Sequence, residues 1–219
     1  TYAAGVFSHL RDPRVADGLA EAFQTGLGLT YDGQGEGSEQ YVEAMLAPMA
    51  RALLVPSVIP ALDGVVDRLS AGVKVVDVGC GTGLAIELLA AAWPNCTFEG
   101  YDVSERAVLV ARDRFDGVDN VAVHLAGGED VPPTADVDLM MTLDCLHDMP
   151  RPDLAMGAIR QAIAPDGTWL VKEIKSSPDW SGNLKNPMLA MMYSTSVASC
   201  MSSAMSSANG LGLGTLGMN

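Results

Sequence analysis

Three glycines at alternate positions, Gly79, Gly81 and Gly83, lie between a β-branched run and an alanine-rich segment. The run, residues 73–78, is almost continuously apolar, which is typical of a strand buried on both faces. Residues 84–93 have helical periodicity. A glycine turn between a strand and a helix lets a ligand approach the backbone closely, and the helix N-terminus favours polar or anionic groups. The pattern therefore predicts a nucleotide-binding turn of the Rossmann type.

Two carboxylates accompany this turn. Asp77 lies two residues before the first glycine, and Asp102 follows a second expected strand at residues 97–101. A carboxylate at the end of that strand can accept hydrogen bonds from both ribose hydroxyls, each worth roughly 1.5–3 kcal/mol. A dinucleotide fingerprint reads G-x-G-x-x-G, but Leu84 occupies the position of its third glycine. The spacing therefore argues against a nicotinamide-dependent oxidoreductase.

With Asp77, the glycine triplet and Asp102 in these contexts, the chain resembles the class I S-adenosylmethionine-dependent methyltransferases, whose loop reads D-x-G-x-G-x-G. The resemblance implies an α/β fold with a Rossmann-like, doubly wound, mainly parallel sheet, and S-adenosyl-L-methionine as the cofactor. Asp77 and the glycines would shape the methionine end, Asp102 would hold the ribose, and a turn at Gly127 and Gly128 would bracket the adenine. Whether Glu129 or Asp130 contacts the adenine amine stays open. The residues implied to bind the cofactor are Asp77, Gly79, Cys80, Gly81, Gly83, Asp102, Val103, Gly127, Gly128, Leu143 and Asp144.

A second stretch with chemical potential, residues 144–149, follows the fourth expected strand at residues 138–143. Ligands of doubly wound sheets bind beyond the carboxyl ends of the strands, so we expect this stretch beside the glycine loop. Either Asp144 or the Leu143 carbonyl would face the amino group of the cofactor. His147 could take a proton from an acceptor hydroxyl or amine, and Asp148 would orient it. The alternative is a helix cap in which His147 bonds to Asp148 or the backbone, because methyl transfer from a sulfonium does not require a base.

The elements that position these residues are expected in two regions. Residues 1–70 read as a helical lead-in or cap, with helical segments at 6–10, 13–23, 40–54 and 61–69. The glycine-rich loop 26–38, which contains Tyr31, either belongs to that cap or covers the ligand. Residues 71–219 are predicted to form the cofactor-binding domain.

Within that domain, Ser104 is expected to cap a helix over residues 107–115, and a third strand is expected at 121–125. His124 in this strand is interpreted as structural. A helix at 154–163, a turn at 165–167 and a strand at 168–174 should follow, then a methionine-rich helix at 187–205. Because nothing after residue 174 has strand composition, we expect the domain to be C-terminally incomplete, with its last strands truncated.

Composition limits the function further. The 219 residues carry a net charge of −14, which argues against binding of nucleic acid or anionic membranes through this chain. The four cysteines form no C-x-x-C pair and lack metal-ligand spacing, so the sequence predicts no bound metal and a reducing, cytoplasmic compartment. No signal peptide and no uninterrupted apolar run of about 18 residues is visible.

A closer resemblance covers most of the chain. Residues 26–31, 144–149, 186–187, 193–194 and Cys200 resemble a bacterial subgroup of class I methyltransferases that carries an N-terminal winged-helix domain, which is absent here. The resemblance implies methylation of an oxygen or nitrogen of a small molecule, and a homodimer in the full-length protein. The alternative is a non-catalytic, S-adenosylmethionine-sensing regulatory module of a winged-helix transcription factor. Such a module would bind the cofactor regardless of His147.

Overall fold

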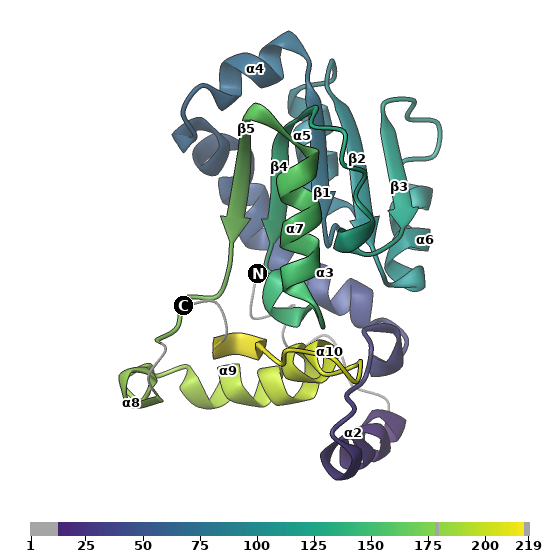
Figure 1. Ribbon diagram of the computed structural model, residues 1–219, viewed down its shortest axis with the longest axis vertical. Helices are drawn as coiled ribbons and strands as arrows, with labels where there is room; N and C mark the ends of the chain where they lie inside the picture. Colours follow the sequence, from purple (N-terminus) through teal and green to yellow (C-terminus); the bar gives the residue numbers. More distant parts are fainter. Residues whose placement is uncertain (1–12, 178–179, 217–219) are drawn as a thin grey trace. The chain divides into compact units, whose positions relative to one another are not determined.

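The structure, a computed structural model, describes residues 13–177 and 180–216 (Figure 1). The described chain forms two compact units. The first, called here the sheet unit, comprises residues 37–143 and 154–171. The second, the helical unit, comprises residues 13–36, 144–153 and the described residues from 172 onward. The helical segment expected at residues 6–10 lies outside the described residues, and the division of the chain into domains at residue 70 stays a prediction.

The sheet unit is built on five parallel strands in the order β3-β2-β1-β4-β5. The strands are β1 (Lys74–Val78), β2 (Thr97–Asp102), β3 (Val121–Leu125), β4 (Val137–Leu143) and β5 (Ile163–Lys172). Val78 is in register with Tyr101 of β2 and with Thr142 of β4, and Asp102 is in register with Leu125. The carboxyl ends of the strands therefore meet at one edge of the sheet. The strand order reverses between β1 and β4, which confirms the doubly wound α/β fold.

Helices cover both faces of this sheet, as expected where right-handed crossover connections run in opposite directions from the first strand. Figure 1 shows α7 in front of the sheet and α5 behind it. The helices of this unit are α3 (Ser38–Leu53), α4 (Val65–Ala71), α5 (Leu84–Ala92), α6 (Glu105–Arg114) and α7 (Pro152–Ala162). Phe98, Ile86, Leu89 and Leu139 are fully buried between these layers. Each such side chain contributes about 1.5–3 kcal/mol relative to an exposed position.

The predicted boundaries of the fifth strand were wrong. The expected turn at residues 165–167 is part of β5, which begins directly after α7 and ends before Glu173. Because β5 is the edge strand, Pro165 can lie in it without removing a hydrogen bond from the interior of the sheet. The Trp169 indole also donates to Thr142 Oγ1 of β4 at 3.1 Å, which ties the two strands together. The helix expected at residues 61–69 likewise begins later, at Val65.

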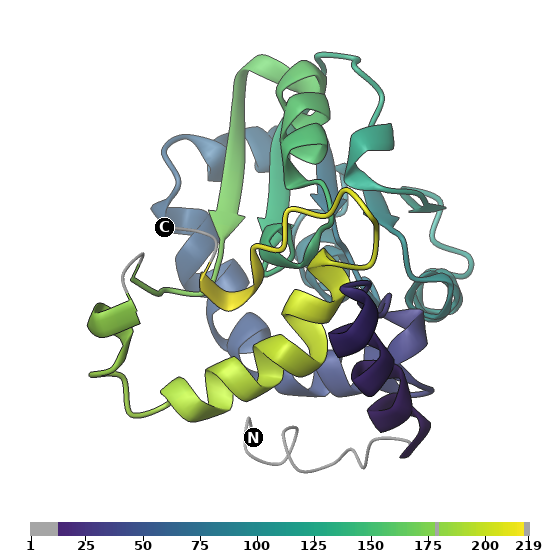
Figure 2. The same ribbon diagram turned by 60° about the horizontal axis from the view of Figure 1, so that its bottom comes forward.

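The helical unit joins segments that are distant in the sequence. Its elements are α2 (Pro13–Thr25), short 3-10 turns at Asp32–Gln34, Leu146–Asp148 and Gly214–Leu216, α8 (Trp180–Asn183), α9 (Leu189–Thr195), a π turn (Ser196–Cys200) and α10 (Met201–Ala204). Figure 2 shows α2 beside the end of the continuous helical run formed by α9, the π turn and α10. Gly28 N donates to Met205 O and Leu29 N to Ser202 Oγ, both at 2.8 Å. The run confirms the helix expected at residues 187–205. No strand follows Lys172 in the described part of the chain.

The longest apolar helical run of the sheet unit, Ser38–Ala61, meets the length and composition of a membrane span within the described residues. The sequence alone had shown no such segment. Its Glu43 is nevertheless hydrogen-bonded to Thr82 and Arg114 of the same unit, which places this part of the run in contact with the glycine loop and α6. These contacts are those expected of a helix that packs on the sheet unit.

The close approach at Gly28 gives a direct test of the helical unit. A Cβ at this position would lie 1.9 Å from the backbone oxygen of Ser202. We expect Gly28→Ala to lower the free energy of unfolding by about 1–3 kcal/mol, measured by urea denaturation. The control is Gly157→Ala in α7, where a Cβ meets nothing within 4 Å; this change should stabilise by roughly 0.5–1 kcal/mol. Equal effects of the two substitutions would contradict the Gly28 contact.

Candidate active site

The glycine loop has the backbone conformation that its sequence predicts. Gly79, Gly81 and Gly83 have φ angles of 72°, 54° and 82°, in the left-handed region that favours glycine. The loop is fixed to β2 because the backbone N–H groups of Gly79 and Cys80 donate to Tyr101 O at 2.8 and 3.1 Å. A Cβ at Gly81 would meet nothing within 4 Å, whereas one at Gly83 would lie 2.6 Å from a ring carbon of Phe115. Gly81 therefore borders open space, and Gly83 permits packing against α6.

Asp102 holds this loop from the end of β2. Its Oδ2 accepts a hydrogen bond from Gly81 N at 2.7 Å, and its Oδ1 accepts one from Ser104 N at 2.9 Å. Ser104 in turn caps α6 by accepting from Ala107 N at 3.1 Å, as the sequence predicted. Val103 is 67% exposed and lies next to this carboxylate in the chain. The structure thus places Asp102 against the loop, while its role toward a ribose stays a prediction.

Asp77, two residues before the loop, is buried with one oxygen unused. The residue is 2% exposed, and its Oδ1 has no hydrogen-bond partner among the described residues. Burial, and secondarily the charge of Asp102, raise the pKa of this carboxyl to about 8. A nearby cation would favour the ionised form. The site is therefore suited to a cationic group of a ligand, such as the ammonium of an amino acid.

The turn after β3 lies at the same edge of the sheet. Ala126 N donates to Asp102 O at 3.0 Å, and Gly127 N donates to Asp130 Oδ2 at 3.0 Å. A Cβ at Gly128 would lie 2.8 Å from Val78 Cγ1, so only glycine lets this turn pack against β1. Glu129 and Asp130 are both exposed, and the carboxylate of Asp130 already accepts a hydrogen bond within its own turn. The question of which acid contacts an adenine amine stays open.

Sequence reasoning missed a polar support of the loop from α3. Glu43 accepts a hydrogen bond from Thr82 Oγ1 at 2.5 Å and from Arg114 Nη2 at 2.8 Å. Arg114 lies 71 residues from Glu43 in the sequence. No local pattern signals such a pairing; the only hint was a single acid within an otherwise apolar part of a helix.

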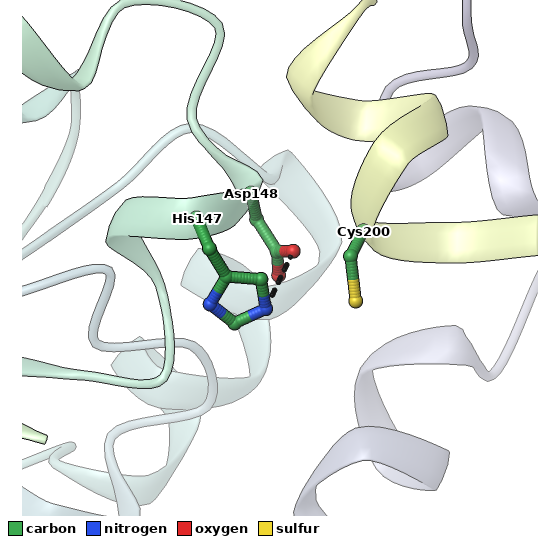
Figure 3. A group of neighbouring side chains, drawn as sticks. All are labelled: His147, Asp148 and Cys200. Carbon is green, nitrogen blue, oxygen red and sulfur yellow. Dashed lines mark ion pairs between the residues drawn. The ribbon is translucent and has the colours of Figure 1, made fainter. Parts of the chain in front are cut away.

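In the helical unit, His147 lies between two carboxylates. Its ring is 3% exposed, and Nδ1 lies 2.5 Å from Glu173 Oε2. Nε2 lies 3.0 Å from Asp148 Oδ1, the ion pair drawn in Figure 3. Glu173 also accepts from Leu146 N at 2.8 Å, and the Tyr31 hydroxyl donates to Asp148 Oδ2. Glu173, expected inside a strand, and Tyr31, expected in a covering loop, are thus partners of the predicted catalytic pair.

These contacts determine the charge of His147. Burial alone lowers its pKa, but the polar contacts with Asp148, Cys200 and Glu173, together with the charge of Asp148, outweigh burial and raise the pKa to about 12. His147 is therefore an imidazolium in this arrangement, bonded as the structural alternative anticipated. A general base must first be neutral, so the catalytic role of His147 stays a prediction with this added condition.

Asp144, which directly follows β4, is bound to Lys172. Asp144 has a φ of 58°, its N–H donates to Lys172 O at 2.7 Å, and its carboxylate pairs with the Lys172 ammonium. Leu143 ends β4. The predicted site residues therefore fall into two sets. Those from Asp77 to Leu143 lie in the sheet unit, and Asp144, His147 and Asp148 lie in the helical unit.

Comparison with known proteins now identifies the class. The model of a family described as a methyltransferase domain matches residues 69–211. The chain is 33% identical over 107 residues to a trans-aconitate 2-methyltransferase of Mycolicibacterium gilvum, covering 48% of this chain and 39% of the relative. It is 34% identical over 100 residues to a ubiquinone biosynthesis O-methyltransferase of Aromatoleum aromaticum, covering 44% and 42%. The chain thus spans about two fifths of the length of these relatives.

Solved structures share the fold. A putative O-methyltransferase from Nostoc punctiforme matches with a TM-score of 0.60 and 20% identity, covering 90% of this chain and 57% of that one. Human N-acetylserotonin methyltransferase, in complex with S-adenosylmethionine, matches with a TM-score of 0.55 and 21% identity, covering 85% and 55%. The chain belongs to the methyltransferase-domain family, within the class I S-adenosylmethionine-dependent methyltransferases.

The raised pKa of Asp77 predicts a pH-dependent stability. The folded state keeps the proton up to about pH 8, while an unfolded chain loses it near its ordinary pKa of about 3.9. The wild type should therefore lose up to about 1.4 kcal/mol per pH unit between these values. Asp77→Asn carries no such penalty, so its stability relative to the wild type should rise from pH 5 to pH 8.5, measured by urea denaturation. A difference between the two proteins that does not change with pH would contradict the assignment.

Proposed function

We propose that this chain is the cofactor-binding portion of an enzyme that transfers a methyl group from S-adenosyl-L-methionine to an oxygen or nitrogen of a small molecule. The observation that carries this proposal is the glycine loop: it borders open space at Gly81, is held by Asp102, and follows the buried Asp77, whose Oδ1 has no partner among the described residues. These features meet at the switch point of the sheet, where such folds bind ligands.

Each part of the cofactor has a group suited to it in the sheet unit. The unused Asp77 oxygen suits the ammonium of the methionine end, the Asp102 carboxylate with Val103 suits the ribose, and the turn at Gly127 and Gly128 suits the adenine. The bound cofactor supplies a methyl group already activated on a sulfonium, so the chain mainly has to bind and orient it. The backbone of Leu143 would close the methionine end.

The acceptor is proposed from the relatives and from the composition. The matched relatives are named for trans-aconitate and for ubiquinone biosynthesis, which supports a small-molecule acceptor and methylation of oxygen. The net charge of −14 does not favour nucleic acid or anionic membranes as partners. We further propose a cytoplasmic enzyme, consistent with four cysteines that form no disulfide in the structure, and a homodimer in the full-length protein.

In the helical unit, we propose that His147 and Asp148 act toward the methyl acceptor. Asp144 would face the amino group of the cofactor. The buried ion contacts of His147 support an orienting role for Asp148. If His147 acts as the base, its imidazolium has to lose the proton before each transfer, and Asp148 and Glu173 would then favour its return. The same buried imidazolium also favours the rival function, a sensing module that binds the cofactor without turnover.

Cofactor binding can be tested on Asp102. We expect Asp102→Ala to weaken S-adenosylhomocysteine about 10- to 150-fold, the equivalent of losing roughly 1.5–3 kcal/mol, measured by calorimetric titration. The control is Asp119→Ala, an exposed acid between α6 and β3, which should bind like the wild type. Failure of the folded wild type to bind would overturn the proposal.

The proposed contact between Asp77 and the methionine end of the cofactor can be tested by measuring proton release on binding. If the cofactor ammonium lies beside Asp77, binding near pH 7 should release a proton from this carboxyl, whose pKa in the free chain is about 8. The binding enthalpy should then vary with the ionisation enthalpy of the buffer, and Asp77→Asn should abolish this variation. A wild-type enthalpy that is the same in phosphate and Tris would contradict the contact.

Substitution of His147 distinguishes the enzyme from the non-catalytic sensing module. An enzyme predicts that His147→Gln leaves S-adenosylhomocysteine affinity unchanged and lowers methyl transfer to a screened acceptor by about 10²–10⁴-fold, the usual contribution of a general acid or base. A sensing module predicts unchanged affinity and no turnover by either protein. Turnover that is equal in the two proteins would remove His147 from the mechanism while keeping the enzyme.

A further inference from the structure

Three potential metal ligands gather in the helical unit. The ligand atoms of His147, Asp148 and Cys200 all lie within 4.8 Å of one another, and the three residues are buried. His147 and Asp148 come from the 3-10 turn Leu146–Asp148, and Cys200 ends the π turn Ser196–Cys200. Figure 3 shows the three side chains converging. Their spacing in the sequence, with Cys200 lying 52 positions after Asp148, explains why no metal motif was visible.

The surroundings of Asp148 Oδ1 also suit a cation. Asp148 is 6% exposed, and its Oδ1, which is inaccessible to water, is paired with the ring of His147. This oxygen lies 3.0 Å from Nε2 of His147. Two ligands of one tetrahedral zinc ion, with bonds of about 2.0–2.2 Å, are separated by roughly 3.3–3.6 Å. The pair is thus nearly at the separation of two ligands of one ion.

The surroundings match those of a metal-bound histidine. Such histidines almost always donate their second ring nitrogen to a carboxylate or carbonyl group, which fixes the ring. Here His147 Nδ1 lies 2.5 Å from Glu173, which is itself held by Leu146 N, so a cation would bind Nε2, the atom that faces Asp148 Oδ1. Tyr31 holds the other oxygen of Asp148 and so leaves Oδ1 to face the cluster.

We propose that His147 Nε2, Asp148 Oδ1 and Cys200 Sγ bind one zinc-class divalent cation, with a fourth position open to water or another ligand. Nitrogen, oxygen and thiolate donors together favour Zn²⁺ over Mg²⁺ or Ca²⁺, which prefer oxygen alone. The site goes beyond the proposed function and replaces the expectation that the chain binds no metal. Because the cation takes the place of the proton on Nε2, its binding excludes His147 as the base in the same molecule.

Replacing two protons by one divalent cation leaves the net charge of the buried cluster unchanged. Without metal, the cluster holds an imidazolium, a thiol and the carboxylates of Asp148 and Glu173, a net charge of −1. With a dication, it holds a neutral imidazole, a thiolate and the same two carboxylates, again −1. One cation enters and two protons leave, from Nε2 and Sγ, so the interior gains no uncompensated charge. The cation would join the turn at residues 146–148 to the π turn, two segments of the helical unit.

The test uses the whole chain after removal of metal by a chelator. Titration with Co²⁺ should give one equivalent bound, tetrahedral visible bands and a thiolate-to-cobalt charge-transfer band, all displaced by Zn²⁺. Cys200→Ser should lose the charge-transfer band, whereas Cys145→Ser, a cysteine outside the cluster, should keep it. Glu173→Gln should weaken Zn²⁺ binding about 10- to 100-fold.

A wild-type chain that binds Co²⁺ without the charge-transfer band, or that retains no Zn²⁺ in equilibrium dialysis at micromolar concentration, would overturn the proposal. So would a Cys145→Ser variant that loses the band while Cys200→Ser keeps it. These readouts do not depend on the cofactor. Loss of S-adenosylhomocysteine binding with metal binding intact would contradict the proposed function alone, and the reverse result would contradict the metal site alone.

Discussion

The hydrogen bonds that Asp102 accepts from Gly81 and Ser104 are the constraint on which the sheet unit depends. One carboxylate fixes the glycine loop at the start of α5 and also the residue that caps α6. The parallel register of β1 and β2 brings the loop and Asp102 to the same edge. Because Gly81 has left-handed geometry and borders open space, the loop gives a ligand access to its backbone. The likeness to class I methyltransferases follows from this local arrangement.

The two units are stabilised in different ways. The sheet unit has a continuous apolar core, made mainly of aliphatic side chains with two phenylalanines. The helical unit buries polar groups, among them Ser199, whose hydroxyl donates to Gln34 at 2.7 Å, and His147 between its two carboxylates. Buried polar networks specify a single arrangement only when every member is satisfied. In the His147 cluster, Asp148 Oδ1 is paired with the imidazolium, and a bound cation would take the place of that contact.

The sequence was most informative where structure depends on neighbouring residues. The β-branched run before Gly79, the glycine triplet and the Ser104 cap all produced local signals, and the structure has the corresponding elements. The sequence did not show which strand lies at the edge of the sheet. Pro165 was therefore predicted in a turn, although it lies in the edge strand β5, where a proline can be accommodated. Long-range partners were also beyond reach. Glu43 with Arg114, and His147 with Glu173, are paired by the fold and leave no periodic pattern.

The central claim, that the edge formed by the glycine loop, Asp102 and the Gly127 turn is the cofactor site, can be tested by hydrogen–deuterium exchange with and without S-adenosylhomocysteine. The account predicts slower exchange in peptides covering residues 79–83, 102–104 and 126–130, because the ligand would cover their backbone N–H groups. Residues 163–172 of the edge strand β5 serve as the internal reference and should change little. Binding accompanied by protection elsewhere, with these three segments unchanged, would contradict the account.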